Sequence, residues 1–283
     1  MQSAVFLILC FPAILCQTLN RHVYVYNGYG SDKIHVSRLV EHLRVRLDAS
    51  YDVATIGANA VKAGAWAKDA ALFMMPGGFD LGFIESLGDE GAEEIKKYVR
   101  EGGSYLGQGA GSYFACDSIQ FDINGTDEVV GDRPLKFYPG ICSGPVYAPY
   151  HYNDYSGARA APIDFEFISP TTGDEEESIN MRAYYNGGNT FQLPIDNENR
   201  TCVTLGSYTE RIDNPAIVKC NIYDGITVLA GVEMQFGSTH LDSNDHFLSV
   251  IKQQLKPYES SRLRAYDSIL RHLGLTTRFA SAL

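Results

Sequence analysis

The chain has 283 residues, of which 45% are hydrophobic and 20% charged, a composition typical of a globular protein with a sizeable core. Its formal net charge is -11, so the chain has no excess of basic residues with which to bind nucleic acid. The same negative charge gives no attraction to an anionic membrane surface. The length fits one α/β domain, and neither a linker nor an internal repeat divides it.

The first element is a short hydrophobic segment. Residues 4–15 are almost wholly apolar, too few for a membrane span, which needs about 20 residues. The run matches the hydrophobic region of a secretory signal peptide, with cleavage expected near Cys16. We therefore expect residues 1–16 to be a signal peptide and residues 17–283 a single domain, with a buried first strand as the alternative. No later segment is suited to spanning a membrane.

The first half of the mature chain alternates strands and helices. In the first helix, apolar residues recur every three to four positions from Val36 to Leu47, and the run from Ala70 to Met75 is continuously apolar, as in a buried parallel strand. The expected strands are 22–26, 51–56, 70–75 and 104–108, and the expected helices begin at 31, 89 and 110. This alternation predicts an α/β fold, a mostly parallel sheet flanked by helices on both faces.

The residue pattern of the sequence changes beyond Pro134. Short Tyr-rich segments punctuated by Gly and Pro run to about Gly231, and they predict β-rich additions with a hairpin at Asp224-Gly225. Two helical segments, 243–255 and 260–273, close the chain.

Cysteine usage and two glycosylation sequons agree with secretion. Removal of the signal peptide leaves four cysteines, whose spacing alone does not select a pairing. Cys202 and Cys220 lie in two β-rich segments suited to neighbouring strands, which favours a Cys202–Cys220 disulfide together with Cys116–Cys142. Asn124-Gly-Thr and Asn199-Arg-Thr would accept glycans in a eukaryotic secretory pathway.

One glycine-rich segment has the pattern of a nucleophile elbow. The sequence Gly107-Gln-Gly-Ala-Gly111 lies between a predicted strand and a predicted helix, where flanking glycines permit a strained turn and the central side chain projects over the sheet. The helix N-terminus would lower a thiol pKa and offer N–H groups to an oxyanion. Pro76-Gly77-Gly78, at the tip of the preceding strand, would lie beside it as an oxyanion loop.

A series of motifs in this chain resembles the biotin–protein ligase N-terminal domain family, within the class I glutamine amidotransferase-like (flavodoxin-like) fold. The resemblance covers roughly residues 22–255, and nothing resembles the biotin-transferring domain, so biotinylation is not implied. The motifs are Pro76-Gly-Gly-Phe-Asp-Leu, the segment from Tyr98 to Phe114, Val130-Gly-Asp-Arg-Pro-Leu, Phe137-Tyr-Pro-Gly, Gly144-Pro, Gly157-Ala-Arg-Ala, Tyr184-Tyr-Asn-Gly-Gly188 and Val228-Leu-Ala-Gly-Val-Glu233.

The resemblance also implies a Cys–His–Glu triad, and here this chain departs from the family pattern. Gly109 stands at the Cys position, Glu233 at the His position and Gln235 at the Glu position. The triad works because His activates the thiol and the carboxylate orients the His. Gly109 supplies no nucleophile and Gln235 carries no charge, so we expect no triad chemistry.

Other chemistry finds little support in the sequence. Ser112 lies three residues past Gly109, about 300° around a helix, and therefore away from the apex of the elbow. Cys116 is expected in the core or in a disulfide. The segment from His240 to His246 matches no zinc spacing, and Asp245 is expected to cap a helix. We expect neither a metal nor a cofactor.

Two functions remain. The first is a secreted, catalytically inactive protein whose former active-site pocket binds a small molecule or an extracellular protein, with no nucleic acid and no membrane span. The alternative is a hydrolase or amidase of altered mechanism with Glu233 as general acid/base, which Glu233→Gln would inactivate. The expected pocket residues are Gly77, Gly78, Gln108, Gly109, Ala110, Tyr113, Tyr185, Asn186 and Glu233.

Overall fold

The computed structural model describes residues 21–152, 154–169, 172–192, 200–211 and 214–279. The predicted signal peptide and the sequon at Asn199 lie outside these residues. Asn124, the other predicted glycan acceptor, is exposed in a turn. No helix in the described ranges is long and apolar enough to cross a membrane.

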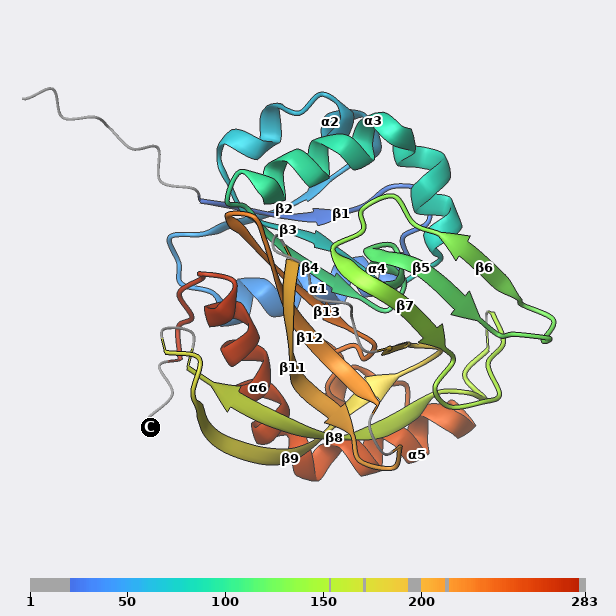
Figure 1. Ribbon diagram of the computed structural model, residues 1–283. Helices are drawn as coiled ribbons and strands as arrows, with labels where there is room; N and C mark the ends of the chain where they lie inside the picture. The colour runs from blue at the N-terminus through green and yellow to red at the C-terminus, as the bar shows by residue number, and fades with distance from the viewer. Residues whose placement is uncertain (1–20, 153, 170–171, 193–199, 212–213, 280–283) are drawn as a thin grey trace, which may run out of the picture.

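The described residues build one large mixed sheet (Figure 1). Its first five strands are parallel and its last four are antiparallel, so the parallel half predicted from the sequence is continued by a β-rich half. The order is β2 (Asp52–Ile56), β1 (His22–Tyr26), β3 (Ala70–Met75), β4 (Ser104–Gln108), β13 (Gly225–Ala230), β12 (Pro215–Ile222), β11 (Arg200–Tyr208), β8 (Arg159–Ile168) and β9 (Glu175–Tyr185).

Alternation along the parallel strands sorts the core into two layers. In β3, Leu72 and Met74 face one layer while Phe73 and Met75 face the other, as the two-residue period of a strand requires. Helices α1 (Lys33–Arg46) and α6 (Glu259–His272) cover the first face, and α2 (Ala58–Lys62) and α3 (Asp80–Arg100) cover the second (Figure 1). Short 3-10 turns lie at Ala65–Lys68, Ser238–His240 and Lys256–Tyr258.

A smaller sheet packs on the same side as α3. Its order is β10 (Thr190–Phe191), β7 (Tyr138–Gly144), β5 (Cys116–Phe121) and β6 (Val129–Asp132). The structure contains both disulfides expected from the sequence: Cys116–Cys142 joins β5 to β7, and Cys202–Cys220 joins β11 to β12. Helix α5 (His246–Leu255) covers the ends of β8 and β9 over a third apolar cluster.

Two predicted helices differ from the observed ones. The range of α3 begins at Asp80 because two helices meet there across a kink at Gly88, whose φ of 57° is not helical; the predicted helix from Asp89 is the second, and the first was not predicted. The helix predicted from Ala110 to Cys116 is the single turn α4 (Ala110–Tyr113), because Cys116 already pairs with Tyr138 as the first residue of β5. The hairpin predicted at Asp224-Gly225 is the β12–β13 turn.

Candidate functional site

A cavity of about 900 Å³ lies at the carboxyl ends of the parallel strands. Strand β1 pairs with β2 on one side and with β3 on the other, so the loops that follow β1 and β3 diverge at this point of the sheet. Such a switch point is where open α/β sheets form their ligand crevices. The lining comes from within the segments 30–38, 78–80, 109–113, 150–152, 154–155, 184–187 and 233–248, together with side chains of the small sheet.

The elbow predicted from the glycine pattern is present between β4 and α4. Gly109 has φ 53° and ψ -119°, a backbone conformation that favours glycine. A Cβ on Gly107 would lie 2.4 Å from the carbonyl oxygen of Gly111, and one on Gly111 would lie 2.2 Å from that of Met75. Both flanking positions therefore need glycine, because any side chain there would collide with a neighbouring backbone carbonyl group.

The apex of this elbow faces Glu233. A Cβ built on Gly109 would lie 3.0 Å from Glu233 Oε1 and 3.6 Å from Gly77 Cα. A side chain at position 109 would therefore touch the side chain at position 233. Two amides that line the cavity, those of Gly78 and Ala110, have no hydrogen-bond partner in the part of the chain that the structure describes. These N–H groups can receive an anionic or carbonyl oxygen of a ligand.

Glu233 is the centre of a polar chain that includes one residue the sequence did not indicate, His35. Glu233 is 3% exposed, and its backbone N–H donates to the carbonyl oxygen of Tyr184 at 2.8 Å. Its Oε2 lies 2.9 Å from His35 Nδ1 and accepts from Gln235 Nε2 at 3.1 Å. The side chains at the two late triad positions are thus hydrogen-bonded to each other, and His35 from α1 is added to them.

The charge of Glu233 acts on the imidazole. Burial by itself would lower the pKa of His35, but the Glu233 carboxylate and, more weakly, Asp32 raise that pKa above its ordinary value of 6.5. The imidazole is 21% exposed, so the pair reaches the cavity from the wall formed by α1. His35 and Glu233 therefore form a polar, partly charged part of the cavity wall next to the elbow.

Gly77 permits this contact. A Cβ at position 77 would lie 2.1 Å from His35 Nδ1 and 2.5 Å from Glu233 Oε1. Gly77 therefore lies directly behind the pair and does not line the cavity. Asp32 holds the backbone of His35 in place as the N-cap of α1, because its Oδ1 accepts a hydrogen bond from the backbone N–H of His35 at 3.0 Å. This N-cap in the loop after β1 was the signal that could have pointed to His35.

The structure brings together most of the predicted pocket residues. The residues that line the cavity as expected are Gly78, Gly109, Ala110, Tyr113, Asn186 and Glu233. Gln108 does not line it: it is fully buried on the opposite face of β4, where it interacts with Tyr266 of α6. Tyr185 is also fully buried, and its hydroxyl donates to Gly188 O at 2.9 Å. Tyr184 faces the cavity in its place because successive strand residues point to opposite faces.

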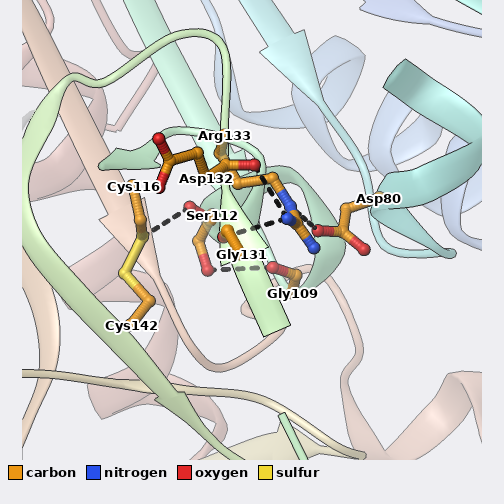
Figure 2. Close-up of polar contacts among 8 residues, drawn as sticks. All are labelled: Asp80, Gly109, Ser112, Cys116, Gly131, Asp132, Arg133 and Cys142. Carbon is orange, nitrogen blue, oxygen red and sulfur yellow. Dashed lines mark hydrogen bonds and ion pairs between the residues drawn. A yellow bond between two sulfur atoms is a disulfide. The ribbon is translucent and has the colours of Figure 1, made fainter. Parts of the chain in front are cut away.

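Figure 2 places Ser112 and Cys116 beside the elbow but away from its apex. Ser112 is fully buried and donates to the carbonyl oxygen of Gly109 at 2.8 Å, with its hydroxyl also in contact with the amide of Asn189. Cys116 is bonded to Cys142. Neither side chain offers a free, cavity-facing nucleophile.

The cavity wall contains a buried ion pair, also drawn in Figure 2. Arg133, directly after β6, contacts Asp80 in the first turn of α3. The Arg133 side chain is 3% exposed and that of Asp80 is 9% exposed. Arg133 also donates to the carbonyl oxygens of Gly131 and Asp132, at 3.1 and 2.9 Å. The pair fastens β6 to the start of α3, next to the cavity-lining loop 78–80.

No cluster of metal ligands occurs in the described ranges, where no three His, Cys, Asp or Glu side chains could hold an ion together. Polar side chains of the segment from His240 to His246 instead form hydrogen bonds with the backbone before and at the start of α5. Asp245 accepts from the amides of Phe247 and Leu248, both at 2.9 Å, as the helix N-cap. His240 Nδ1 accepts from the backbone N–H of Gly237 at 3.0 Å.

Comparison with known proteins agrees with this geometry. The family model described as "Biotin-protein ligase, N terminal" matches residues 21–282. The chain belongs to this family. A biotin–protein ligase of Schizosaccharomyces pombe is 31% identical over 258 residues, which are 90% of this chain and 38% of that enzyme. An uncharacterized protein of Chlamydia muridarum is 33% identical over 174 residues, 60% of this chain and 62% of that protein. The chain thus spans little more than a third of the first curated relative and slightly less than two thirds of the second.

Solved structures establish the wider fold of this biotin–protein ligase N-terminal family member. A glutamine amidotransferase from Thermotoga maritima superposes with a TM-score of 0.52 over 90% of this chain and 98% of the other, at 11% identity. A second glutamine amidotransferase gives a TM-score of 0.51 over 88% and 98% of the two chains, at 13% identity. The glutamine amidotransferase-like fold expected from the sequence is confirmed.

Proposed function

We propose that this chain is a secreted, non-catalytic member of the biotin–protein ligase N-terminal family that uses its elbow cavity to bind a ligand. The observation that supports this most directly is Gly109. Gly109 keeps the strained backbone of the elbow but carries no side chain. A Cβ built on it would lie 3.0 Å from Glu233 Oε1. A nucleophile, a base and an orienting carboxylate must act together in triad catalysis, and the first of these is missing.

The cavity suits binding without chemistry. A volume of about 900 Å³ is within the range of small-molecule sites, and the lining combines aromatic and apolar side chains with many polar and charged groups. The unpaired amides of Gly78 and Ala110 and the side chain of Glu233 would orient a ligand. Secretion is part of the proposal because two disulfides, which persist in oxidising compartments, accompany the signal-like first residues.

A second candidate function, hydrolysis by an altered mechanism, is favoured by one specific contact. His35 Nδ1 lies 2.9 Å from Glu233 Oε2, so the carboxylate orients an imidazole at the cavity wall. A carboxylate-oriented histidine is the arrangement of a general base, and His35 would accept a proton from water that attacks a substrate. In this mechanism Glu233 positions the base and does not itself transfer the proton.

The deciding experiment measures turnover by the secreted protein against glutamine, γ-glutamyl, peptide and ester substrates. The binding function predicts no turnover above background, and it predicts activity after Gly109→Cys, Glu233→His and Gln235→Glu are combined. The matched control combines Gly109→Ala with the same two changes and differs by one sulfur atom. Turnover by the unmodified protein that is lost in both His35→Gln and Glu233→Gln would refute the binding function and establish the altered hydrolase.

A further inference from the structure

We propose that the cavity binds an organic cation, an ammonium or guanidinium group carried on an apolar stem. The proposal rests on the proposed binding function and adds the chemical class of the ligand. Two features of the cavity carry it. One is a set of aromatic rings in its lining, and the other is a set of lining carboxylates that form no ion pair with a lysine or arginine in the described part of the chain.

The first aromatic group is a continuous row. The rings of Tyr113 and Phe121 lie 5.6 Å apart, those of Phe121 and Tyr150 5.3 Å, and those of Tyr150 and Tyr152 5.2 Å, all in edge-to-face geometry. All four line the cavity. The row runs from buried Tyr113, beside the elbow, to Tyr152, which is 41% exposed. Aromatic faces attract cations that lie within about 6 Å of the ring centroid.

A second aromatic group lies next to the polar chain. The rings of Tyr184 and Phe236 are 4.9 Å apart, and the ring of Phe236 is 5.0 Å from the imidazole of His35. Burial, and then the charge of Glu233, raises the pKa of Tyr184 well above its ordinary value of 10.0. The phenol is neutral at physiological pH, and the face of its ring offers the negative quadrupole that attracts a cation. The same direction, from burial first, holds for Tyr113 and Tyr150.

Carboxylates supply the second feature. Asp32, Asp154, Asp242 and Asp245 all line the cavity. Each of them accepts hydrogen bonds from backbone amides, and none forms an ion pair with a lysine or arginine in the described part of the chain. A cation that enters would gain attraction from charges that the protein leaves uncompensated.

The positive groups of the lining are already engaged or neutral. Arg38 Nη1 lies 2.7 Å from Glu41 Oε2, and His35 is paired with Glu233. Burial, and then the neighbouring Arg38, lowers the pKa of His240 below 6.5, so this imidazole is uncharged at neutral pH. Around the carboxylates and aromatic rings the lining therefore favours a cation, while the amides of Gly78 and Ala110 can hold an oxygen atom of the same ligand.

The test uses probes of matched shape and different charge. Isothermal titration calorimetry of the secreted protein would compare n-butylguanidinium with n-butylurea, its uncharged isostere, and with butyrate. We expect n-butylguanidinium to bind at least about tenfold more tightly than n-butylurea and to weaken as salt screens the carboxylates. Equal affinities, a preference for n-butylurea or butyrate, or no binding of n-butylguanidinium at millimolar concentration would each overturn the proposal.

Substitutions separate the aromatic contribution from the apolar one. Tyr152→Leu should weaken n-butylguanidinium binding about two- to fivefold, while Tyr152→Phe, which keeps the ring face, should retain it. Asp242→Asn should weaken binding as well. Its matched control is Asp224→Asn, another exposed carboxylate at the β12–β13 turn, at the opposite end of the parallel strands. Equal binding by all four variants would contradict the proposed site.

A peptide pair distinguishes the two sources of such a cation. Acetyl-Gly-Arg-Gly-amide carries the guanidinium on a peptide, and acetyl-Gly-citrulline-Gly-amide is its neutral counterpart. Binding of the arginine peptide indicates a basic side chain of an extracellular protein, and binding of n-butylguanidinium alone indicates a small-molecule cation. Preferential binding of neutral or anionic probes would leave the binding function standing and refute only the cation. Turnover lost in His35→Gln would refute the binding function itself.

Discussion

Removing one partner of the Arg133–Asp80 pair should destabilise the protein far more than removing a surface charge. Both side chains are less than a tenth exposed, at 3% and 9%. Arg133→Met leaves Asp80 charged and buried, and Asp80→Asn does the same to Arg133. The loss of one partner from a buried pair costs about 3–5 kcal/mol. In a domain of this size that corresponds to a melting temperature lowered by about 6–20 °C.

A double-mutant cycle tests the reasoning. Urea denaturation of oxidised protein would measure the free energy of unfolding for both single variants and for Arg133→Met with Asp80→Asn. Because the double variant leaves no uncompensated charge, it should recover most of the stability lost by either single change. The control is Arg100→Met, which breaks an exposed pair with Glu93 and should cost no more than about 1 kcal/mol. Additive losses, or a loss for Arg133→Met as small as the control, would refute the argument.

Three further predictions concern the elbow and its polar chain. Gly111→Ala should destabilise the protein more than Gly109→Ala, because the new Cβ at position 111 would lie 2.2 Å from the carbonyl oxygen of Met75. Gly109→Ala should cost only the backbone strain of its positive φ, about 1–3 kcal/mol. Equal losses of unfolding free energy in urea denaturation would contradict this. Glu233→Gln should lower the pKa of His35, and an unchanged His35 titration by NMR would argue against the contact. Since the folded pKa is raised above 6.5, the stability that wild type gains over Glu233→Gln should be largest below pH 6.5 and fall as pH rises through the folded pKa.

The parallel half of the fold could be predicted from the sequence because its signals are local. The apolar run from Ala70 to Met75 and the glycine pattern around Gly109 each determine their own backbone, and the observed strand and elbow follow them. The disulfide Cys202–Cys220 followed from two segments with strand patterns. The order of the antiparallel strands depends on contacts between distant segments, which no local pattern encodes.

The site was predicted less completely than the fold, for two physical reasons. Strand alternation decides whether Tyr184 or Tyr185 meets the cavity, and the sequence gives two adjacent tyrosines with no sign of which faces which side. His35 belongs to no motif, and only the approach of α1 to the segment after β13 brings it to Glu233. The Asp32 cap marks where α1 begins, but it does not reveal the partner of a histidine three residues later.

The glycine at position 77 gives an engineer a steric switch for the polar chain. Because a Cβ there would overlap both His35 Nδ1 and Glu233 Oε1, Gly77→Ala would force these side chains to move without substituting either of them. The geometry of the pair can therefore be changed from a third position, and since the Glu233 carboxylate raises the pKa of His35, separating the two would lower that pKa. A side chain at position 77 therefore requires a different arrangement of His35 and Glu233 from the one seen here.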